Sequence, residues 1–456
     1  MSTKHIGMFH SVPYDEDKDM QQPIGTIVLL IFIGTYLAIS SERVNRTAMA
    51  MTGMGLVGLV LWIAHTLDPL GEQGATFTHL VETIEWQTLL FVTAMMVIVA
   101  IAGQSGMFQY MALNLAKPAG GHPRRIFIVF IVFVFFISLL FDTTSTILIM
   151  APLTIEICKA LEVDFKPFLI GEAVTANFAS IPSVVGAVPN LVIAGETGLD
   201  AGFLFLTLMP LAVILLIVSL FIMLRWFDSS LVESEEALVD AVTIVTPERM
   251  IRSRTDFYAA LFGIFILALG FMFGTGIGLE PSLIAVLIAF ALLLMVHEHV
   301  ERILSQISWG TVFFLIGIFG LVGSLEIVGA IDDMGLAVEQ LVGENTGAAI
   351  GFLVWVPSVL SAIIDNIPVS VVLAPIAVTL AETSTSQLFS VVLVFAVNVG
   401  GYLLPIGAPA NILAMAMAEK ERDPISFAAF AKVASVLALI HLAIGTGWLL
   451  LLSVLV

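Results

Sequence analysis

Two carboxylates lie in matching polar interruptions of an otherwise apolar chain, 223 positions apart. Asp142 is followed by Thr143 and Thr144, and Asp365 is followed by Asn366. An acidic side chain inside such apolar sequence is costly to bury, so it indicates a functional site by default. The chemistry open to a pair of this kind is reversible binding of a proton or a metal cation.

The duplication extends well beyond the two carboxylates. Trp86 recurs as Trp309 at the same offset of 223. Farther along, three residues recur with spacings of nine and thirteen in both copies, namely Asn177, Gly186 and Asn190 as Asn398, Gly407 and Asn411. Matching polar interruptions in two hydrophobic halves indicate an internal repeat and point to the binding site of a secondary transporter.

The bulk composition indicates an all-α integral membrane protein. Apolar residues make up 59% of the chain and charged residues 12%, and the mean hydropathy is +1.07. A soluble domain has about 45–50% apolar and about 25% charged residues. Long continuous apolar runs suit helices that cross a bilayer, whereas barrel strands would alternate. The lipid bilayer is therefore the first expected partner, and residues 1–23 are expected to be a polar tail rather than a cleaved signal.

Several function classes are disfavoured by composition and motifs. The net charge is −19, from 36 acidic and 17 basic residues, which disfavours nucleic-acid binding. Cys158 is the single cysteine, so neither an internal disulfide nor a cysteine metal site can form. His297-Glu298-His299 is read as a solvated loop rather than a metal site. No phosphate-binding Gly-Lys loop and no nucleophile–base pair is visible, so we expect neither ATP drive nor an enzyme.

The distribution of Lys and Arg predicts that the two halves are inverted. Short cytoplasmic loops collect basic residues. Lys159 and Lys166 flank a loop whose mate, residues 382–387, has no basic residue, whereas Lys420 and Arg422 occupy the mate of a loop that has none. Corresponding segments should therefore face opposite sides of the membrane. The expected organisation is a tail over 1–23, a first transmembrane repeat over 24–225, a cytoplasmic linker over 226–256 and a second repeat over 257–456.

Each half should contain a re-entrant hairpin and a broken helix. Residues 124–166 have basic residues at both ends and Asp142 near the middle, so they should enter the membrane and return, and residues 347–387 should do so from the other side. The next segment in each half is too rich in Pro, Gly, Ser and Asn for one continuous helix. The residues expected to break these helices are Gly186, Pro189, Gly400, Gly401, Gly407 and Pro409.

The sequence Asp365-Asn366-Ile367-Pro368, followed by Ile406-Gly407-Ala408-Pro409-Ala410-Asn411, resembles the ion transporter superfamily. That group includes arsenite efflux permeases, NhaD-type sodium/proton antiporters, the P protein and divalent-anion/sodium symporters. The resemblance covers Trp86 to about Phe427. It implies ten crossings with two hairpins, a homodimer in the cell's inner (plasma) membrane, and a scaffold with an elevator-like transport domain. At the hairpin position where dianion symporters carry a motif similar to Ser-Asn-Thr, this sequence has Asp142-Thr143-Thr144. This difference disfavours a dianion as the substrate.

We therefore expect a secondary active, ion-coupled permease that needs no cofactor. The leading hypothesis is antiport or efflux, of the Na⁺/H⁺ or arsenite type, with H⁺ or Na⁺ as coupling ion and no bound metal beyond transported Na⁺. The alternatives are a sodium-coupled symporter of a small anion such as a dicarboxylate or sulfate, and a passive channel. The expected ion- or substrate-binding residues are Asp142, Thr143, Thr144, Asn177, Asn190, Asp365, Asn366, Asn398 and Asn411.

These residues also have structural interpretations. Asp142 and Asp365 could cap broken helices, and the four repeated Asn could satisfy backbone groups left free at the breaks.

Overall fold

The computed structural model describes residues 18–40, 44–67, 76–119, 122–231, 247–273, 278–296, 300–342, 345–382 and 387–455. All regular secondary structure in these ranges is helical. Seven of the described helices are at least 18 residues long and apolar enough to cross a membrane, and shorter apolar helices accompany them. The expected all-α polytopic architecture is thus confirmed. His297-Glu298-His299, residues 1–17 of the expected tail and residues 232–246 of the expected linker lie outside the described residues.

Two sets of seven helices follow one another in the same order. The first set consists of α4 (Trp86–Ser105), α5 (Met107–Ala116), α6 (Pro123–Ser138), α7 (Thr143–Ala160), α8 (Lys166–Ala179), α9 (Val188–Thr197) and α10 (Ala201–Trp226). The second set consists of α15 (Trp309–Ile327), α16 (Ala330–Val342), α17 (Thr346–Ile363), α18 (Asn366–Glu382), α19 (Leu388–Gly400), α20 (Pro409–Lys420) and α21 (Phe427–Leu455).

Both sets begin with the same local contact. The indole Nε1 of Trp86 donates to the carbonyl oxygen of Val81 at 3.3 Å, and that of Trp309 donates to Leu304 at 3.2 Å. In each case the acceptor lies five residues earlier, in a short helix, α3 (Phe77–Glu82) or α14 (Val300–Leu304). The repeated Trp therefore links the first helix of each set to the short helix before it.

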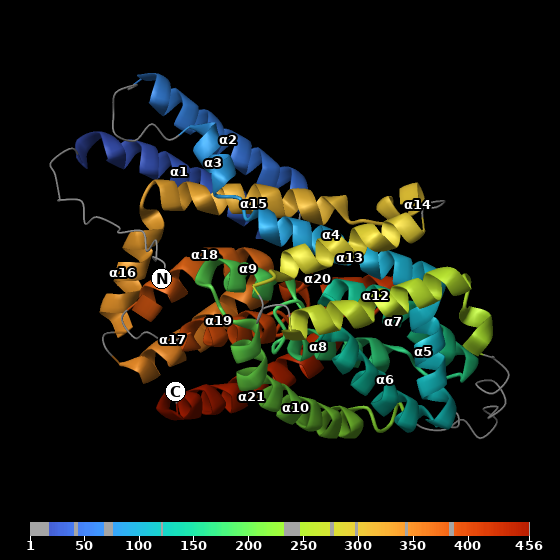
Figure 1. The fold of residues 1–456 in the computed structure, drawn as a ribbon. Coiled ribbons are helices and arrows are strands. Elements are labelled where there is room, and N and C mark those ends of the chain that lie inside the picture. The colour runs from blue at the N-terminus through green and yellow to red at the C-terminus, as the bar shows by residue number, and fades with distance from the viewer. Residues whose placement is uncertain are drawn as a thin grey trace, which may run out of the picture.

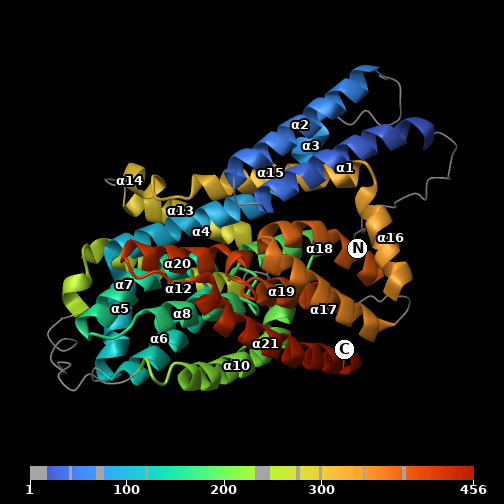
Figure 2. The ribbon, with the colours of Figure 1, turned by 180° about the vertical axis from the view of Figure 1, so that it is seen from behind.

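The two sets run in opposite directions. In Figures 1 and 2, α4 runs from α3 towards α5, whereas α15 runs from α14 back towards α16. The amphipathic helices α5 and α16 consequently lie at opposite ends of the molecule. This is the inverted repeat that the Lys and Arg pattern predicts.

A pair of helices that precedes each set of seven completes the bundle. Helices α1 (Lys18–Ser40) and α2 (Arg46–Leu67) pack on α15, and α12 (Arg254–Phe273) and α13 (Pro281–Met295) pack on α4. We call α1, α2, α4, α12, α13 and α15 the scaffold. Helix α1 begins at Lys18, so helical structure starts within the segment expected to be a tail.

A second group of helices packs around α8 and α19. Every residue from Pro167 to Ala179 and from Leu388 to Gly400 is buried, which is why neither stretch has a polar face in the sequence. Helices α6 and α7 pack on α8, and α17 and α18 pack on α19. The groups cross over, because α7 also packs on α20 of the other repeat and α18 on α9. We call α6 to α10 and α17 to α21 the hairpin unit.

The loops of the two repeats meet at the surface of the hairpin unit. After α7, the Nζ of Lys166 contacts Asp423, in the loop after α20, at 2.7 and 2.8 Å from its two carboxylate oxygens, and Lys159 contacts Glu421 in the same region. Elsewhere, the backbone N–H of Asp200, after α9, donates to the side-chain oxygen of Gln387, before α19, at 3.2 Å. The loop between α7 and α8 thus contacts the loop between α20 and α21, and the equivalent pair of loops, α18–α19 and α9–α10, makes contact in the same way.

Candidate functional site

The carboxylates Asp142 and Asp365 each stand at the tip of a hairpin. Asp142 is the N-cap of α7, and its Oδ1 accepts from the backbone N–H groups of Thr144 and Ser145 at 3.0 and 3.1 Å. Asp365 precedes α18, and its Oδ1 accepts from the N–H of Ile367 at 3.1 Å. An N-cap carboxylate satisfies N–H groups that have no partner within the helix. One oxygen of each carboxylate thus has the expected structural role, and the second remains for other partners.

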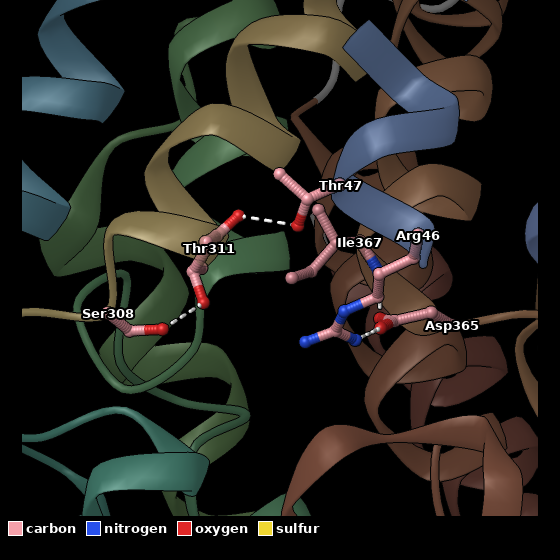
Figure 3. A network of polar contacts seen from close by, with 7 residues as sticks. Arg46, Thr47, Ser308, Thr311, Asp365 and Ile367 are labelled. Carbon is pink, nitrogen blue, oxygen red and sulfur yellow. Dashed lines mark hydrogen bonds and ion pairs between the residues drawn. The ribbon is translucent and has the colours of Figure 1, made fainter. Parts of the chain in front are cut away.

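The second oxygens of the two carboxylates have different partners. Oδ2 of Asp142 contacts the hydroxyl of Ser145 in its own helix. Oδ2 of Asp365 lies 2.8 Å from Nη1 of Arg46, at the start of α2 (Figure 3). The Arg46 side chain is 40% exposed and that of Asp365 12%, so this ion pair is partly shielded from solvent. Among the described residues, Asp142 makes no ion pair and no hydrogen bond joins the two carboxylates.

The other polar residues of the tips are largely buried. Thr143 and Asn366, which follow the two carboxylates, are 7% and 3% exposed. The side-chain nitrogen of Asn366 faces Gly401, since it would lie 3.3 Å from a β-carbon placed there. Thr144 is half-buried. These residues therefore flank the two carboxylates at the hairpin tips.

Gly186 and Gly407 let each hairpin approach its broken helix closely. A β-carbon on Gly186 would lie 2.6 Å from the carbonyl oxygen of Ser138, and one on Gly407 would lie 2.6 Å from that of Ser361. Ser138 ends α6, and Ser361 lies near the end of α17 at the equivalent position. In both copies, therefore, only a residue without a β-carbon allows the hairpin to approach the broken helix this closely.

The helix interruptions lie where the sequence places them. Helix α8 ends at Ala179 and α9 begins at Val188, with Pro189 at its start; α19 ends at Gly400 and α20 begins at Pro409. Proline at the first positions of a helix lacks only an N–H that would have no helical partner. Gly400 and Gly401 stand at the end of α19, where that helix stops.

Four buried asparagines hold the two breaks together. Asn190 Nδ2 donates to the carbonyls of Ser180 and Ser183 at 2.9 and 2.8 Å, across the first break. Asn411 Nδ2 donates to Gly401 at 2.8 Å, across the second. Between the repeats, Asn398 donates to Oδ1 of Asn190 at 2.6 Å, and Asn177 donates to Oδ1 of Asn411 at 3.1 Å. The structural interpretation of these residues thus accounts for their side-chain nitrogens, all of which are committed to protein oxygens.

One side-chain oxygen of this asparagine cluster has a hydrogen-bond partner in the second repeat but not in the first. Oδ1 of Asn398 accepts from the Ser180 hydroxyl at 3.2 Å. The equivalent atom, Oδ1 of Asn177, is buried and has no hydrogen-bond partner among the described residues. The cause is local, because Gly401 occupies the position equivalent to Ser180 and has no hydroxyl to offer. Asn177 is consequently the member of the cluster that keeps a free acceptor for an ion or a water.

Two charged residues of interest escaped sequence reasoning. The Arg46 side chain pairs with Asp365, although Arg46 belongs to no repeated motif of the sequence. Glu172 lies fully buried in α8, where Oε1 accepts from the Thr154 hydroxyl at 2.5 Å and Oε2 has no partner among the described residues. The available signal was a lone acid within the apolar run from Phe168 to Val174, but the second repeat does not duplicate it.

A buried histidine lies beside the second break. His441 of α21 contacts the Tyr402 hydroxyl through Nδ1 at 2.6 Å and the Ser219 hydroxyl of α10 through Nε2 at 3.1 Å. Both ring nitrogens therefore have partners, and the ring packs against Phe178 with its centroid 5.2 Å away. These hydrogen bonds connect α10 and α21 to the second break and satisfy both ring nitrogens of the buried histidine.

Comparison with solved structures supports the fold. The crystal structure of the Alcanivorax borkumensis YdaH transporter superposes with a TM-score of 0.60 at 15% sequence identity, covering 94% of this chain and 97% of the other. That structure was described as having an unusual topology. At this identity the similarity establishes the shared fold alone.

Comparison of sequences identifies relatives along nearly the whole chain. An uncharacterized transporter of Mycobacterium tuberculosis is 30% identical over 431 residues, which is 93% of this chain and 98% of the relative. The human P protein is 25% identical over 511 residues, covering 94% of this chain and 60% of that protein. The resemblance to the ion transporter superfamily is confirmed by these matches. The family model described as "Citrate transporter" (CitMHS) matches residues 36–389, and the chain therefore belongs to this family of membrane transporters.

Proposed function

We propose that this protein is a secondary active transporter that couples substrate movement to a gradient of H⁺ or Na⁺ through Asp142 and Asp365. The observation that carries the proposal is that the two repeats each present a carboxylate at a hairpin tip beside a broken helix. Discontinuous helices of this kind supply free N–H and carbonyl groups to ions without requiring further full charges.

The expected exchange chemistry follows because such a carboxylate binds either one proton or one cation at a time. In a partly desolvated site, a carboxylate is stabilised by one proton or one cation, and these compete for it. Thr143, Thr144 and Asn366 offer neutral oxygens, the ligand type that hard cations prefer. A carrier that moves only when its carboxylates are neutralised then exchanges H⁺ for Na⁺ or another small cation across the membrane. Antiport or efflux is accordingly our leading proposal.

A second candidate, symport of a carboxylate anion with cations, is favoured by two observations. The matching family model carries the description of a citrate transporter. Arg46 also brings a guanidinium beside Asp365, and guanidinium groups bind carboxylates in a two-point geometry. Citrate is therefore a substrate to test directly, together with dicarboxylates and sulfate. A passive channel is a third alternative, which uphill transport would eliminate.

Reconstitution into proteoliposomes distinguishes these candidates. We would impose a pH gradient and screen Na⁺, Li⁺, K⁺, arsenite, citrate and sulfate for their ability to dissipate it. Dissipation by Na⁺ or Li⁺ without an anion supports antiport, and Na⁺- or H⁺-dependent uphill citrate uptake supports symport. Flux that only follows the electrochemical gradient would contradict the secondary-active proposal. Empty liposomes and the Asp142→Asn/Asp365→Asn double variant are the controls.

The oligomeric state, the membrane and the moving unit are proposed from the resemblance to the ion transporter superfamily. We infer a homodimer in the plasma membrane in which the hairpin unit moves against the scaffold, with no cofactor beyond the coupling ion. Mass measurement in detergent or nanodiscs tests the dimer, and cysteine cross-linking between scaffold and hairpin unit tests the movement.

A further inference from the structure

The ion pair between Arg46 and Asp365 joins the scaffold to the hairpin unit. Arg46 is the first residue of α2, which packs on α15, while Asp365 is at the tip between α17 and α18. The two residues are 319 positions apart in sequence. Any displacement of the hairpin unit against the scaffold must therefore break this contact.

Arg46 is held in place by the scaffold itself. Its guanidinium carbon lies 5.3 Å from the ring centroid of Phe314 in α15, within the range of a cation–π contact. The adjacent Thr47 donates its hydroxyl to the carbonyl of Gly310, also in α15, at 2.9 Å (Figure 3). The cation is thus positioned by α2 and α15 before it contacts the hairpin.

The contact occupies the part of Asp365 that a transported ion would need. Oδ1 of Asp365 is committed to the N–H of Ile367, and Oδ2 is 2.8 Å from Arg46. A metal cation or a proton that uses Oδ2 competes with the guanidinium, because two positive charges on one oxygen repel each other strongly at contact distance.

Among the described residues, the tip of the first repeat makes no such contact. Helix α13 packs on α4 as α2 packs on α15, but it begins at Pro281, preceded by Glu280, and supplies no cation at its start. Asp142 instead directs Oδ2 to Ser145 of its own helix. The two otherwise equivalent tips therefore differ in whether the scaffold provides a counter-ion.

We propose that Arg46 is a tethered counter-ion that competes with the transported cation or proton for Asp365. Binding of the ion releases the hairpin unit from the scaffold, and departure of the ion restores the ion pair. Arg46 thereby sets the apparent affinity of the Asp365 site and links its occupancy to movement. This proposal rests on the proposed coupling role of Asp365.

The test compares Arg46→Gln, which removes the charge, with Arg46→Lys, which keeps it. We expect Arg46→Gln to lower the apparent KM for the exchanged cation by about three- to tenfold, the range for loss of one partly exposed competing charge, while the maximal rate falls. Arg46→Lys should stay within about twofold of wild type. Arg124→Gln, which removes an exposed ion pair with Asp228 at 3.2 Å, is the matched control and should leave KM unchanged.

A double-mutant cycle shows whether the effect passes through Asp365. Na⁺, Li⁺ and H⁺ would each be titrated against the thermal unfolding of purified protein, since a ligand of the native state raises the unfolding temperature. Arg46→Gln should strengthen this stabilisation in the wild-type background and have no effect on it in the Asp365→Asn background. An unchanged or weaker ion response in Arg46→Gln, or the same gain without Asp365, would overturn the counter-ion role.

The same measurements separate failure of this inference from failure of the proposed function. Loss of citrate affinity in Arg46→Gln with no gain in cation affinity would overturn the counter-ion proposal and assign Arg46 to the anion. Absence of uphill transport in wild type, together with the expected cation response in the unfolding assay, would refute secondary active transport but support competition at Asp365.

Discussion

Asn398 of the second repeat donates a hydrogen bond to Asn190 of the first at 2.6 Å, and both side chains are fully buried. Asn190 in turn donates to two carbonyls at the first break. The second repeat therefore holds in place the residue that closes the interruption in the first. The reciprocal bond from Asn177 to Asn411 does the same in the opposite sense.

Replacing Asn190 with Ala should destabilise the fold by about 2–3 kcal/mol, because it leaves several buried polar groups without partners. Unfolding in detergent, followed by circular dichroism or intrinsic fluorescence, measures the change. Asn114→Ala is the control, since the half-buried Asn114 makes one side-chain hydrogen bond among the described residues, to the carbonyl of Tyr110 at 3.0 Å. Equal losses in the two variants would contradict the role of the asparagine cluster.

The substitutions Asp142→Asn and Asp365→Asn should each abolish coupled transport and preserve folding. Asn retains the size and the capping oxygen but cannot become a carboxylate. Proteoliposome flux measures the loss, and size-exclusion chromatography confirms the folded state. Asp200→Asn serves as the control because Asp200 caps α10, accepting from Phe203 N–H at 2.7 Å, outside either hairpin. Normal coupling in either hairpin variant would exclude that carboxylate from the mechanism.

Adding one methyl group at Gly186 or Gly407 should force the hairpin away from the broken helix. Each new β-carbon would lie 2.6 Å from a backbone carbonyl oxygen, which cannot move aside as a flexible side chain can. Such overpacking costs about 1–3 kcal/mol, so we expect lower unfolding temperatures and strongly reduced transport. Gly55→Ala, where nothing lies within 4 Å, should be tolerated. Wild-type stability of Gly186→Ala would show that this approach is not tight.

Glu172 should tolerate Gln far better than Lys. Glutamine keeps an acceptor for the Thr154 hydroxyl in the same volume, whereas lysine would bury an ammonium in a site that provides no carboxylate partner among the described residues. We expect Glu172→Gln to unfold close to the wild-type temperature and Glu172→Lys to be severely destabilised. Comparable stability of the two variants would mean that water reaches this position.

The apparent affinity for a transported cation should depend on pH if one proton competes for the same carboxylate. In the pH range in which that carboxylate is protonated, affinity should weaken about tenfold for each unit that the pH falls. Flux measured at several pH values in liposomes tests this. A pH-independent affinity, combined with strictly Na⁺-dependent anion uptake, would replace the antiport proposal with the symport candidate.

Much of this fold could be predicted because the same sequence motifs occur in both halves of the chain. Trp86 and Trp309 mark the start of each repeat, and the duplicated Asp and Asn mark the hairpin tips and the breaks. The inversion could be predicted as well, because Lys and Arg distribute according to membrane side. These features are repeated or periodic, and so they are visible without a structure.

The features that could not be predicted are those that occur once. Arg46 has no equivalent among the described residues of the other half, and its partner lies 319 positions away, so neither spacing nor duplication links the two. Glu172 was missed for the same reason, because Leu393 takes its place in the second repeat. The Asn177 oxygen is left without a partner because Gly401 replaces Ser180 in the second repeat. That consequence becomes visible only when the structures of the two breaks are compared.

The crossed asparagine bonds also constrain how the protein is made. Asn177 and Asn190 belong to the first repeat, but their partners Asn411 and Asn398 are synthesised more than 200 residues later. The bonds of Asn190 to Ser180 and Ser183 and of Asn177 to Ala173 can form within the first half, whereas the side-chain oxygen of Asn190 gains its partner only from the second. The central polar network is consequently completed only after nearly the whole chain has been translated.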